Sequence, residues 1–276
     1  MKIANTLMLF LAVVVFQNTC FGQITAPENT FKFDKNTKLT FLEFSIGLSS
    51  LSFIDFATSP LKYNGYPIDI MLAHTEIDAK HSSRFGINYV FGNLSNDFNS
   101  QNSQSQFKSL TLSYSELFRL GFLSSNKLNT KIGGHLNTTG NFRQNERLFN
   151  SSKGIEVIGT LFASIQTRLE INNNSINKKE LFFNADVGII NSSYRNAYAY
   201  VGQGALLNND DFFDGYQFSI FSGNRFSTQL GYKAYLKNNN AIQVSYLCDA
   251  YKTSNKPNNF QLESHTLRLV CFLNLK

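Results

Sequence analysis

The sequence predicts an all-β protein that folds as one antiparallel up-and-down β-barrel of about ten strands. Strand-like segments recur along the chain, many of them alternate apolar and polar residues, and the links between them alternate in length. The odd links hold about 15, 14, 15, 33 and 8 residues and the even links about 4, 6, 9 and 4, as in barrels with short turns at one rim and long loops at the other. The predicted strands are 38–50, 66–79, 84–92, 107–120, 127–138, 154–170, 180–190, 224–236, 241–252 and 261–275.

Several of these strands have an apolar and a polar face, and 66–79 is the least regular of the predicted strands. In 154–170, Val157 and Leu161 lie on one face, whereas Glu156 and Arg168 lie on the other. This period of two is typical of strands, because a helix would repeat its faces every 3.6 residues.

Three features favour a transmembrane barrel with its apolar faces outward. The predicted strands run to about 11–15 residues, longer than most soluble strands and enough to cross a membrane when tilted. The polar faces carry charge at mid-strand, and an arginine such as Arg268 would cost roughly 2–4 kcal/mol if it faced lipid. The links also alternate in length, and this alternation is not expected in a Greek-key sandwich. A secreted soluble β-barrel or sandwich, with the apolar faces inward, is the alternative.

The N-terminus predicts a secretory signal peptide over residues 1–22. Lys2 is followed by an apolar core from Leu7 to Phe16, and small residues precede a cleavage site before Gln23. A lipoprotein anchored through Cys20 is the rival interpretation. Residues 23–37 are then expected to form a short periplasmic segment, and residues 38–276 a single barrel domain.

With this signal, the long amphipathic strands, the asymmetric loops and a strand at the C-terminal end, the chain resembles bacterial outer-membrane β-barrel proteins as a class. The resemblance covers nearly the whole mature chain, but no motif narrows it to one family. Many such proteins end in an aromatic residue, whereas this chain ends in Asn274-Leu275-Lys276. The resemblance implies the outer membrane of a Gram-negative bacterium, with lipid and lipopolysaccharide as partners.

Charge and cysteine content agree with this environment. The formal charge is +6, and removal of Lys2 with the signal leaves about +5, which suits anionic headgroups but falls short of a nucleic-acid signature. No protein partner is indicated. The cysteines of the mature chain, Cys248 and Cys271, are not expected to form a disulfide, because the predicted hairpin register keeps them far apart.

Charged side chains on the polar faces are expected to pair inside the narrow barrel and to plug it. A gated or narrow path for small solutes is the alternative. The expected interior set is Glu43, Arg84, Arg119, Lys131, Glu156, Arg168, Asp186, Arg225, Lys233, Asp249 and Arg268.

The segment 191–223 is predicted to be a long outer loop. One more hairpin within it would give twelve strands instead of ten. It is rich in aromatic residues, so it is a candidate recognition surface or a lid over the barrel mouth. The candidate binding residues are Tyr194, Tyr198, Tyr200, Phe212 and Phe213.

No catalytic residue can be assigned from a motif. Some barrels of this class are enzymes, among them omptin-like proteases with paired carboxylates and a His–Asp couple near the outer rim. The candidates of that kind are Glu263 with His265, and Asp210 with Asp211. We therefore expect a non-enzymatic role in surface interaction, envelope integrity or small-solute passage, with a lipid- or peptide-hydrolysing enzyme at the outer rim as the alternative. The histidines lack metal-ligand spacing, so no metal or cofactor is expected.

Overall fold

The computed structural model describes residues 38–56, 59–96, 103–125, 127–145, 147, 153–172, 178–195, 217–220, 225–236, 238–253 and 259–275. The predicted signal peptide 1–22 and the segment 23–37 lie outside this part of the chain. No helix among the described residues is long and apolar enough to cross a membrane. The described strands are β1 (Leu39–Asp55), β2 (Ser59–Gly65), β3 (Ile68–Ile77), β4 (His81–Asn96), β5 (Ser103–Arg119), β6 (Leu128–Gln144), β7 (Lys153–Asn172), β8 (Lys179–Arg195), β9 (Gln217–Ile220), β10 (Arg225–Tyr235), β11 (Ala241–Lys252) and β12 (Phe260–Asn274), and one 3₁₀ turn, η2 (Gly121–Leu123), follows β5.

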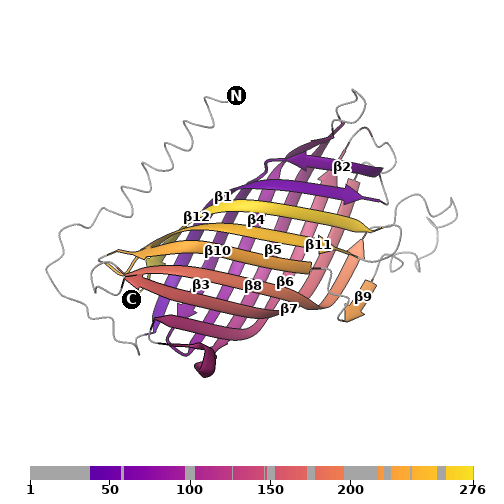
Figure 1. Ribbon diagram of the computed structural model, residues 1–276. Helices are drawn as coiled ribbons and strands as arrows, with labels where there is room; N and C mark the ends of the chain where they lie inside the picture. Colours follow the sequence, from indigo (N-terminus) through magenta and orange to yellow (C-terminus); the bar gives the residue numbers. More distant parts are fainter. Residues whose placement is uncertain are drawn as a thin grey trace, which may run out of the picture. The chain divides into compact units, whose positions relative to one another are not determined.

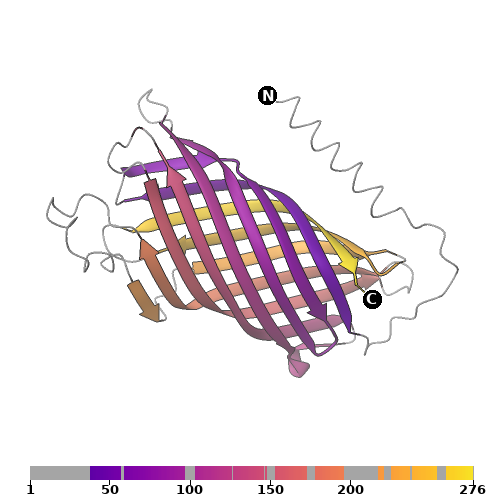
Figure 2. The same ribbon diagram turned by 180° about the vertical axis from the view of Figure 1, so that it is seen from behind.

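These strands close into an antiparallel up-and-down barrel (Figure 1, Figure 2). The first strand pairs with the last, from Phe41↔Asn274 to Asp55↔Phe260. Strands β2 and β3 lie one after the other along β1, and β9 and β10 do the same along β8. The twelve described strands therefore occupy ten positions in the wall. The predicted ten-stranded barrel is confirmed, and the twelve-stranded alternative is wrong.

Two local irregularities shape the wall. Strands β2 and β3 are interrupted at Tyr66 and Pro67, because proline has no N–H to donate to the ladder. The Pro67 carbonyl still accepts a hydrogen bond from the Ser49 N–H at 3.0 Å, which keeps the broken strand against β1. In β8 a bulge skips Ile189, so that the inward-facing positions change from even to odd numbers and Arg195 turns inside.

We refer to the end of the barrel where β1 begins and β12 ends as the terminal rim, and to the other end as the opposite rim. Toward the opposite rim the strands run further than predicted, to Asp55 in β1, Asn96 in β4 and Gln144 in β6. Polar residues are frequent in these extensions, so the apolar alternation is weaker there while the backbone pairing continues. The predicted contrast between long and short links is therefore wrong for residues 56–58, 97–102 and 145–152.

Two turns at the terminal rim show why the chain reverses there. In the turn between β3 and β4, the Asp78 carboxylate accepts hydrogen bonds from the N–H groups of Lys80 and His81 at 2.7 and 2.6 Å. Burial works against this carboxylate, but the two backbone N–H groups outweigh it and hold the pKa of Asp78 below its usual value. In the turn between β10 and β11, Asn239 takes a φ of 62°, a conformation that asparagine tolerates well.

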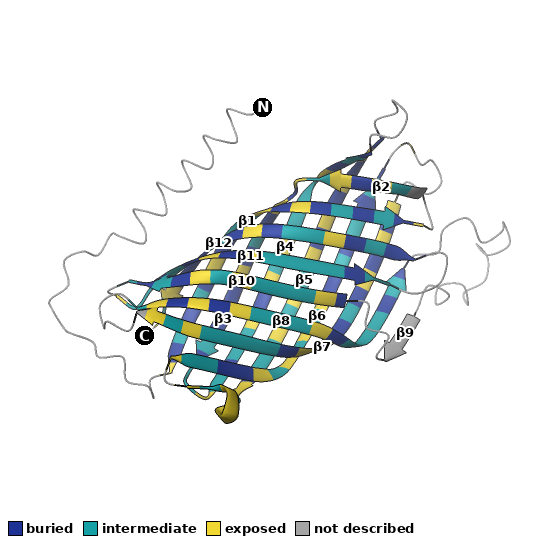
Figure 3. Ribbon diagram, viewed as in Figure 1, coloured by how far each residue is buried: buried dark blue, intermediate teal, exposed yellow. Residues whose placement is uncertain are grey.

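The outer wall of the barrel is apolar, and its inner wall is largely polar. In β12, Leu267 is 60% exposed whereas the next residue, Arg268, is 7% exposed. Figure 3 shows the same alternation of exposed and buried positions along the other strands. Apolar faces outward and charges inward are therefore confirmed, and the inward-facing apolar arrangement of the soluble alternatives is wrong. Outward-facing exposed side chains include Leu48, Leu72, Phe85, Leu112, Leu136, Leu161, Phe183, Leu230, Val244 and Leu267.

Candidate functional site

The interior at the opposite rim is filled by an aromatic and aliphatic cluster, which we call the plug. Phe53 of β1 lies at its centre, with ring centroids 5.1 Å from Tyr63, 6.1 Å from Phe107 and 5.7 Å from Phe260. These rings come from β1, β2, β5 and β12, so they bridge the interior from several sides of the wall. The plug consists of Leu51, Phe53, Tyr63, Leu94, Phe107, Ile158, Tyr251, Phe260 and Leu262.

A buried ionic network accompanies the plug. Arg143 of β6 contacts Asp55 at 2.8 Å and Glu156 at 2.9 Å, and Arg195 of β8 contacts the same two carboxylates at 2.6 and 3.0 Å. Glu156 is 0% exposed. The Arg143 guanidinium also lies 4.3 Å from the centre of the Phe260 ring. Two cations and two anions thus neutralise one another and tie β1, β6, β7 and β8 together at the plug.

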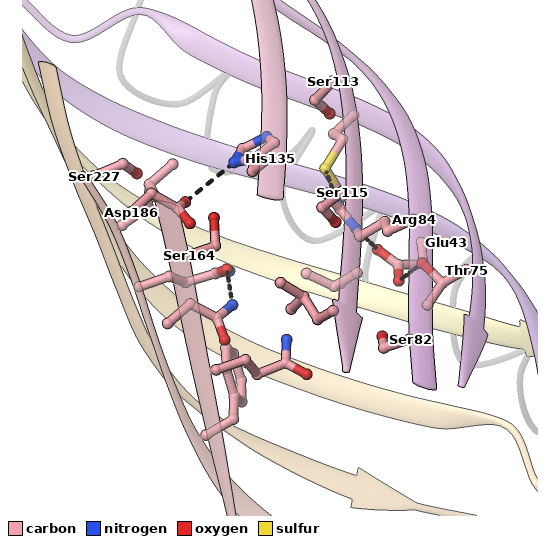
Figure 4. Close-up of a pocket in the computed structure, with 18 of the residues that line it drawn as sticks. Glu43, Thr75, Ser82, Arg84, Ser113, Ser115, His135, Ser164, Asp186 and Ser227 are labelled. Carbon is pink, nitrogen blue, oxygen red and sulfur yellow. Dashed lines mark hydrogen bonds and ion pairs between the residues drawn. The ribbon is translucent and has the colours of Figure 1, made fainter. Parts of the chain in front are cut away.

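Between the plug and the terminal rim the interior contains a polar chamber of about 210 Å³. Its wall carries the ion pair of Arg84 with Glu43 at 3.1 Å, and Thr75 donates a hydrogen bond to the same glutamate. Across the chamber, His135 of β6 lies 3.2 Å from Asp186 of β8 (Figure 4). Hydroxyl and amide side chains fill the spaces between the charges, so the chamber suits water or a polar solute.

Two further arginine–carboxylate pairs separate the chamber from the plug. Arg268 binds Asp69 through two hydrogen bonds of 2.8 and 2.9 Å, and Asn88 donates to the same carboxylate at 3.0 Å. Arg225 binds Asp249 at 3.0 Å. A planar guanidinium matched to a carboxylate fixes the orientation of both groups, so this layer holds neighbouring strands in register.

At the terminal rim the interior carries both signs of charge. Lys178, just before β8, lies 2.8 Å from Glu180 and 3.1 Å from Glu170. Burial disfavours the charged ammonium, but the two carboxylates outweigh it and raise the pKa of Lys178. The Lys131 ammonium donates to the carbonyls of Asp78 and His81, both at 2.6 Å, and thereby braces the turn between β3 and β4.

The comparisons with known proteins agree with this geometry. No protein-family model matches the sequence, and no curated protein matches it. Among solved structures, the outer membrane protease OmpT from Escherichia coli is similar at a TM-score of 0.52 and 8% identity, over 90% of this chain and 99% of that one. This is the fold of a bacterial outer-membrane β-barrel. At this identity the similarity concerns the fold alone.

Two autotransporter domains are also similar to this outer-membrane barrel. The transport unit of AIDA-I from Escherichia coli has 9% identity and a TM-score of 0.41, over 97% of each chain. The translocator domain of NalP from Neisseria meningitidis has 7% identity and a TM-score of 0.39, over 98% of this chain and 96% of that one.

The outer-membrane barrel places the predicted interior residues at three depths. Glu156 belongs to the plug network, and Lys131 to the turn at the terminal rim. Arg119, the last residue of β5, is exposed at the terminal rim and is not brought into an ion pair with the other predicted residues. Those that line the chamber are Glu43, Arg84, Arg168, Asp186, Arg225, Lys233, Asp249 and Arg268.

The candidate catalytic pair Glu263 and His265 lies on the outer wall of β12. The two side chains contact each other at 3.0 Å, and the second ring nitrogen of His265 contacts the Tyr246 hydroxyl at 2.6 Å. Cys248 faces His265 across the β11–β12 pair. His265 thus lies between a carboxylate and a tyrosine hydroxyl on the outer wall, and neither Glu263 nor His265 lines the polar chamber of the interior.

The remaining candidate binding and catalytic residues, all from the segment 191–223, lie either in β8 or outside the described residues. Tyr194 lies in β8, on the outward side between the inward-facing Ser193 and Arg195. The remaining candidates, Tyr198, Tyr200, Asp210, Asp211, Phe212 and Phe213, lie outside the described residues. Among the described residues, Cys248 and Cys271 are free and no group of three His, Cys, Asp or Glu could hold a metal ion.

Several charged residues of the interior were not predicted from the sequence, among them Asp55, Asp69, Arg143 and Arg195. Asp55, Arg143 and Arg195 fall in segments predicted to be loops, and Asp69 lies in the least regular of the predicted strands. In β6 the alternation does continue through Asn141 to Arg143, so a longer strand could have been read there. The bulge at residue 189 explains why Arg195 was not predicted to face the interior. Before the bulge the even-numbered residues of β8 point inward, and after it the odd-numbered ones do.

Proposed function

We propose that this chain is a non-enzymatic outer-membrane protein whose interior is closed at rest, and that it acts through its outer wall and its rims in surface interaction or envelope integrity. The plug and its ionic network carry this proposal. Rings and paired charges from eight strands fill the interior at the opposite rim, so small-solute passage would require the plug to move. Export through the predicted signal peptide would place the terminal rim in the periplasm of a Gram-negative bacterium.

Conductance measurements test whether the interior is closed. The refolded full chain in a planar lipid bilayer is expected to show no steady ion current. Removing two rings of the plug, Phe53→Ala with Phe260→Ala, is expected to produce discrete conductance steps, because the substitutions empty the centre of the cluster. The matched control is Phe183→Ala, which removes a ring from the outer wall and should leave the bilayer silent. A stable open-channel current in the unmodified protein would contradict the proposal.

Lysine side chains point outward from the wall near the opposite rim, where they could contact anionic lipid. Lys62 of β2 and Lys252 of β11 belong to one cross-strand row with Ile54 and Gln261. Lys108 of β5 also points outward, between the buried Phe107 and Ser109. Lysines at this height suit the phosphates of lipopolysaccharide in an outer leaflet.

Replacing these lysines tests the lipid partner. The triple variant Lys62→Gln, Lys108→Gln and Lys252→Gln is expected to bind lipopolysaccharide more weakly, by roughly fivefold for each ammonium removed at low salt. Retention of fluorescent lipopolysaccharide by the detergent-solubilised barrel measures the effect. Lys179→Gln, at the terminal rim, is the matched control. Equal retention by the triple variant and the control would refute the contact.

A further inference from the structure

One wall of the chamber is a regular ladder of polar side chains on three neighbouring strands. On β7, β8 and β10, paired rows place Arg168 beside Phe182, Gln166 beside Asn184, and Ser164 beside Asp186. On the far side of β8, Gln229 pairs with Asn184, and Lys233 pairs with Glu180. All these side chains line the same chamber, and Figure 4 labels Ser164 and Asp186 among them.

The end of this ladder nearest the terminal rim carries two cations without a carboxylate partner. Lys233 is 4% exposed, and its ammonium lies 3.4 Å from the centre of the Phe272 ring. Within the described part of the chain, the side chains of Lys233 and Arg168 form no hydrogen bond and no ion pair. The Glu180 carboxylate, on the residue that pairs with Lys233 across the strands, already contacts the Lys178 ammonium and accepts a hydrogen bond from the Tyr235 hydroxyl. Among the described residues, no carboxylate therefore lies within ion-pair distance of this buried ammonium, whose close contacts are aromatic rings.

The middle of the ladder carries buried oxygen atoms without donors. These are the Ser164 hydroxyl and the amide oxygens of Gln166 and Asn184. The Asn184 amide nitrogen is occupied, because it donates to Gln229 at 3.2 Å, and this fixes the direction of its oxygen. Ser164 is 7% exposed. Buried acceptors of this kind are normally satisfied by water or by a ligand that donates hydrogen bonds.

We propose that the chamber binds a small polyhydroxylated anion, of the sugar-acid or sugar-phosphate class. Its carboxylate or phosphate would lie between Lys233 and Arg168, and its hydroxyl groups would donate to Gln166, Asn184 and Ser164. A sugar-sized solute fits the chamber volume of about 210 Å³. The two halves of the site thus recognise the two halves of one molecule, the charge at one end and the hydroxyl groups at the other.

Calorimetric titration of the full chain, refolded in detergent, tests this site with gluconate as the probe. Gluconate is expected to bind, whereas glucose, which lacks the charge, and acetate, which lacks the hydroxyl groups, should each bind at least roughly tenfold more weakly. Lys233→Met keeps the apolar contact with Phe272 and should abolish gluconate binding. Lys179→Met, exposed at the terminal rim and outside the chamber lining, is the control and should bind as the unmodified protein does.

If Lys233→Met does not fold, Arg168→Gln serves as the second test variant. Arg168 is only partly buried, so this variant is expected to fold. It should weaken gluconate binding while leaving the heat-modifiable gel migration of the folded barrel unchanged. The inference is overturned if the folded, unmodified barrel does not bind gluconate, or if Arg168→Gln binds it as tightly as Lys179→Met does. Neither result bears on whether the barrel conducts ions, so the closed-barrel proposal is judged separately.

Discussion

Leu230→Arg is expected to lower the free energy of unfolding of the membrane-inserted barrel by roughly 2–4 kcal/mol, a large fraction of the stability of a typical domain. Leu230 lies in the middle of β10 and belongs to a row of outward-facing apolar side chains that continues from strand to strand, through Phe183, Tyr246, Leu267 and Leu48. A guanidinium there would have to leave water for the hydrocarbon region. Urea titration of the protein refolded into lipid vesicles, followed by heat-modifiable gel migration, measures the loss.

The matched control for this substitution is Asn64→Arg. Asn64 also points outward and is exposed, but it lies near the opposite rim, in the row of Ser52. Near the membrane surface the cost of an arginine falls to roughly 0–1 kcal/mol. If the two variants lost the same stability, the apolar wall would not be the lipid-facing surface.

The second large effect is expected at the plug. Glu156→Gln should cost roughly 3–5 kcal/mol, because Arg143 and Arg195 would be left with one buried carboxylate fewer. The side chain keeps its size, so the loss reports the charge and not a cavity. A double variant that adds Arg143→Met should recover part of the loss, because it removes the excess cation as well. Urea midpoints in lipid vesicles provide the comparison.

Glu263→Gln is the control for the plug variant. Glu263 also pairs with a basic side chain, His265, but on the exposed outer wall. A pair in contact with solvent should be worth less than about 1 kcal/mol. Losses of similar size at Glu156 and Glu263 would mean that the plug network does not hold the strands together.

The sequence pattern predicted the strand interiors well, because a wall between lipid and a polar interior forces alternation at every position. Leu161 and Arg168 could be assigned to opposite faces for this reason alone. The strand ends could not be predicted in this way, since beyond the apolar wall both faces may be polar while the backbone still pairs. Asp55 and Arg143 lie in those extensions, and the plug network was therefore missed.

The partners within the interior could not be predicted either. Arg268 contacts Asp69 although 199 positions separate them in the chain, and this depends on the closure of the barrel and on its register. Lys131 and Lys233 carry charge on polar faces, as predicted, yet neither contacts a carboxylate: one binds backbone carbonyls and the other aromatic rings. The alternation along a strand predicts whether a side chain points inward or outward. Its contact partner lies on a strand that is distant in sequence, so the partner cannot be predicted from the alternation.

The pairing of β1 with β12 has a consequence for how the protein is made. These two strands come from the two ends of the barrel sequence, and neither has another partner on that side of the wall. Until the C-terminal segment has been synthesised, β1 and β11 would each present an open row of backbone donors and acceptors, which invites association with other chains. Closure depends on contacts between distant residues, which form slowly. Nascent copies therefore need protection from one another until the final segment is available.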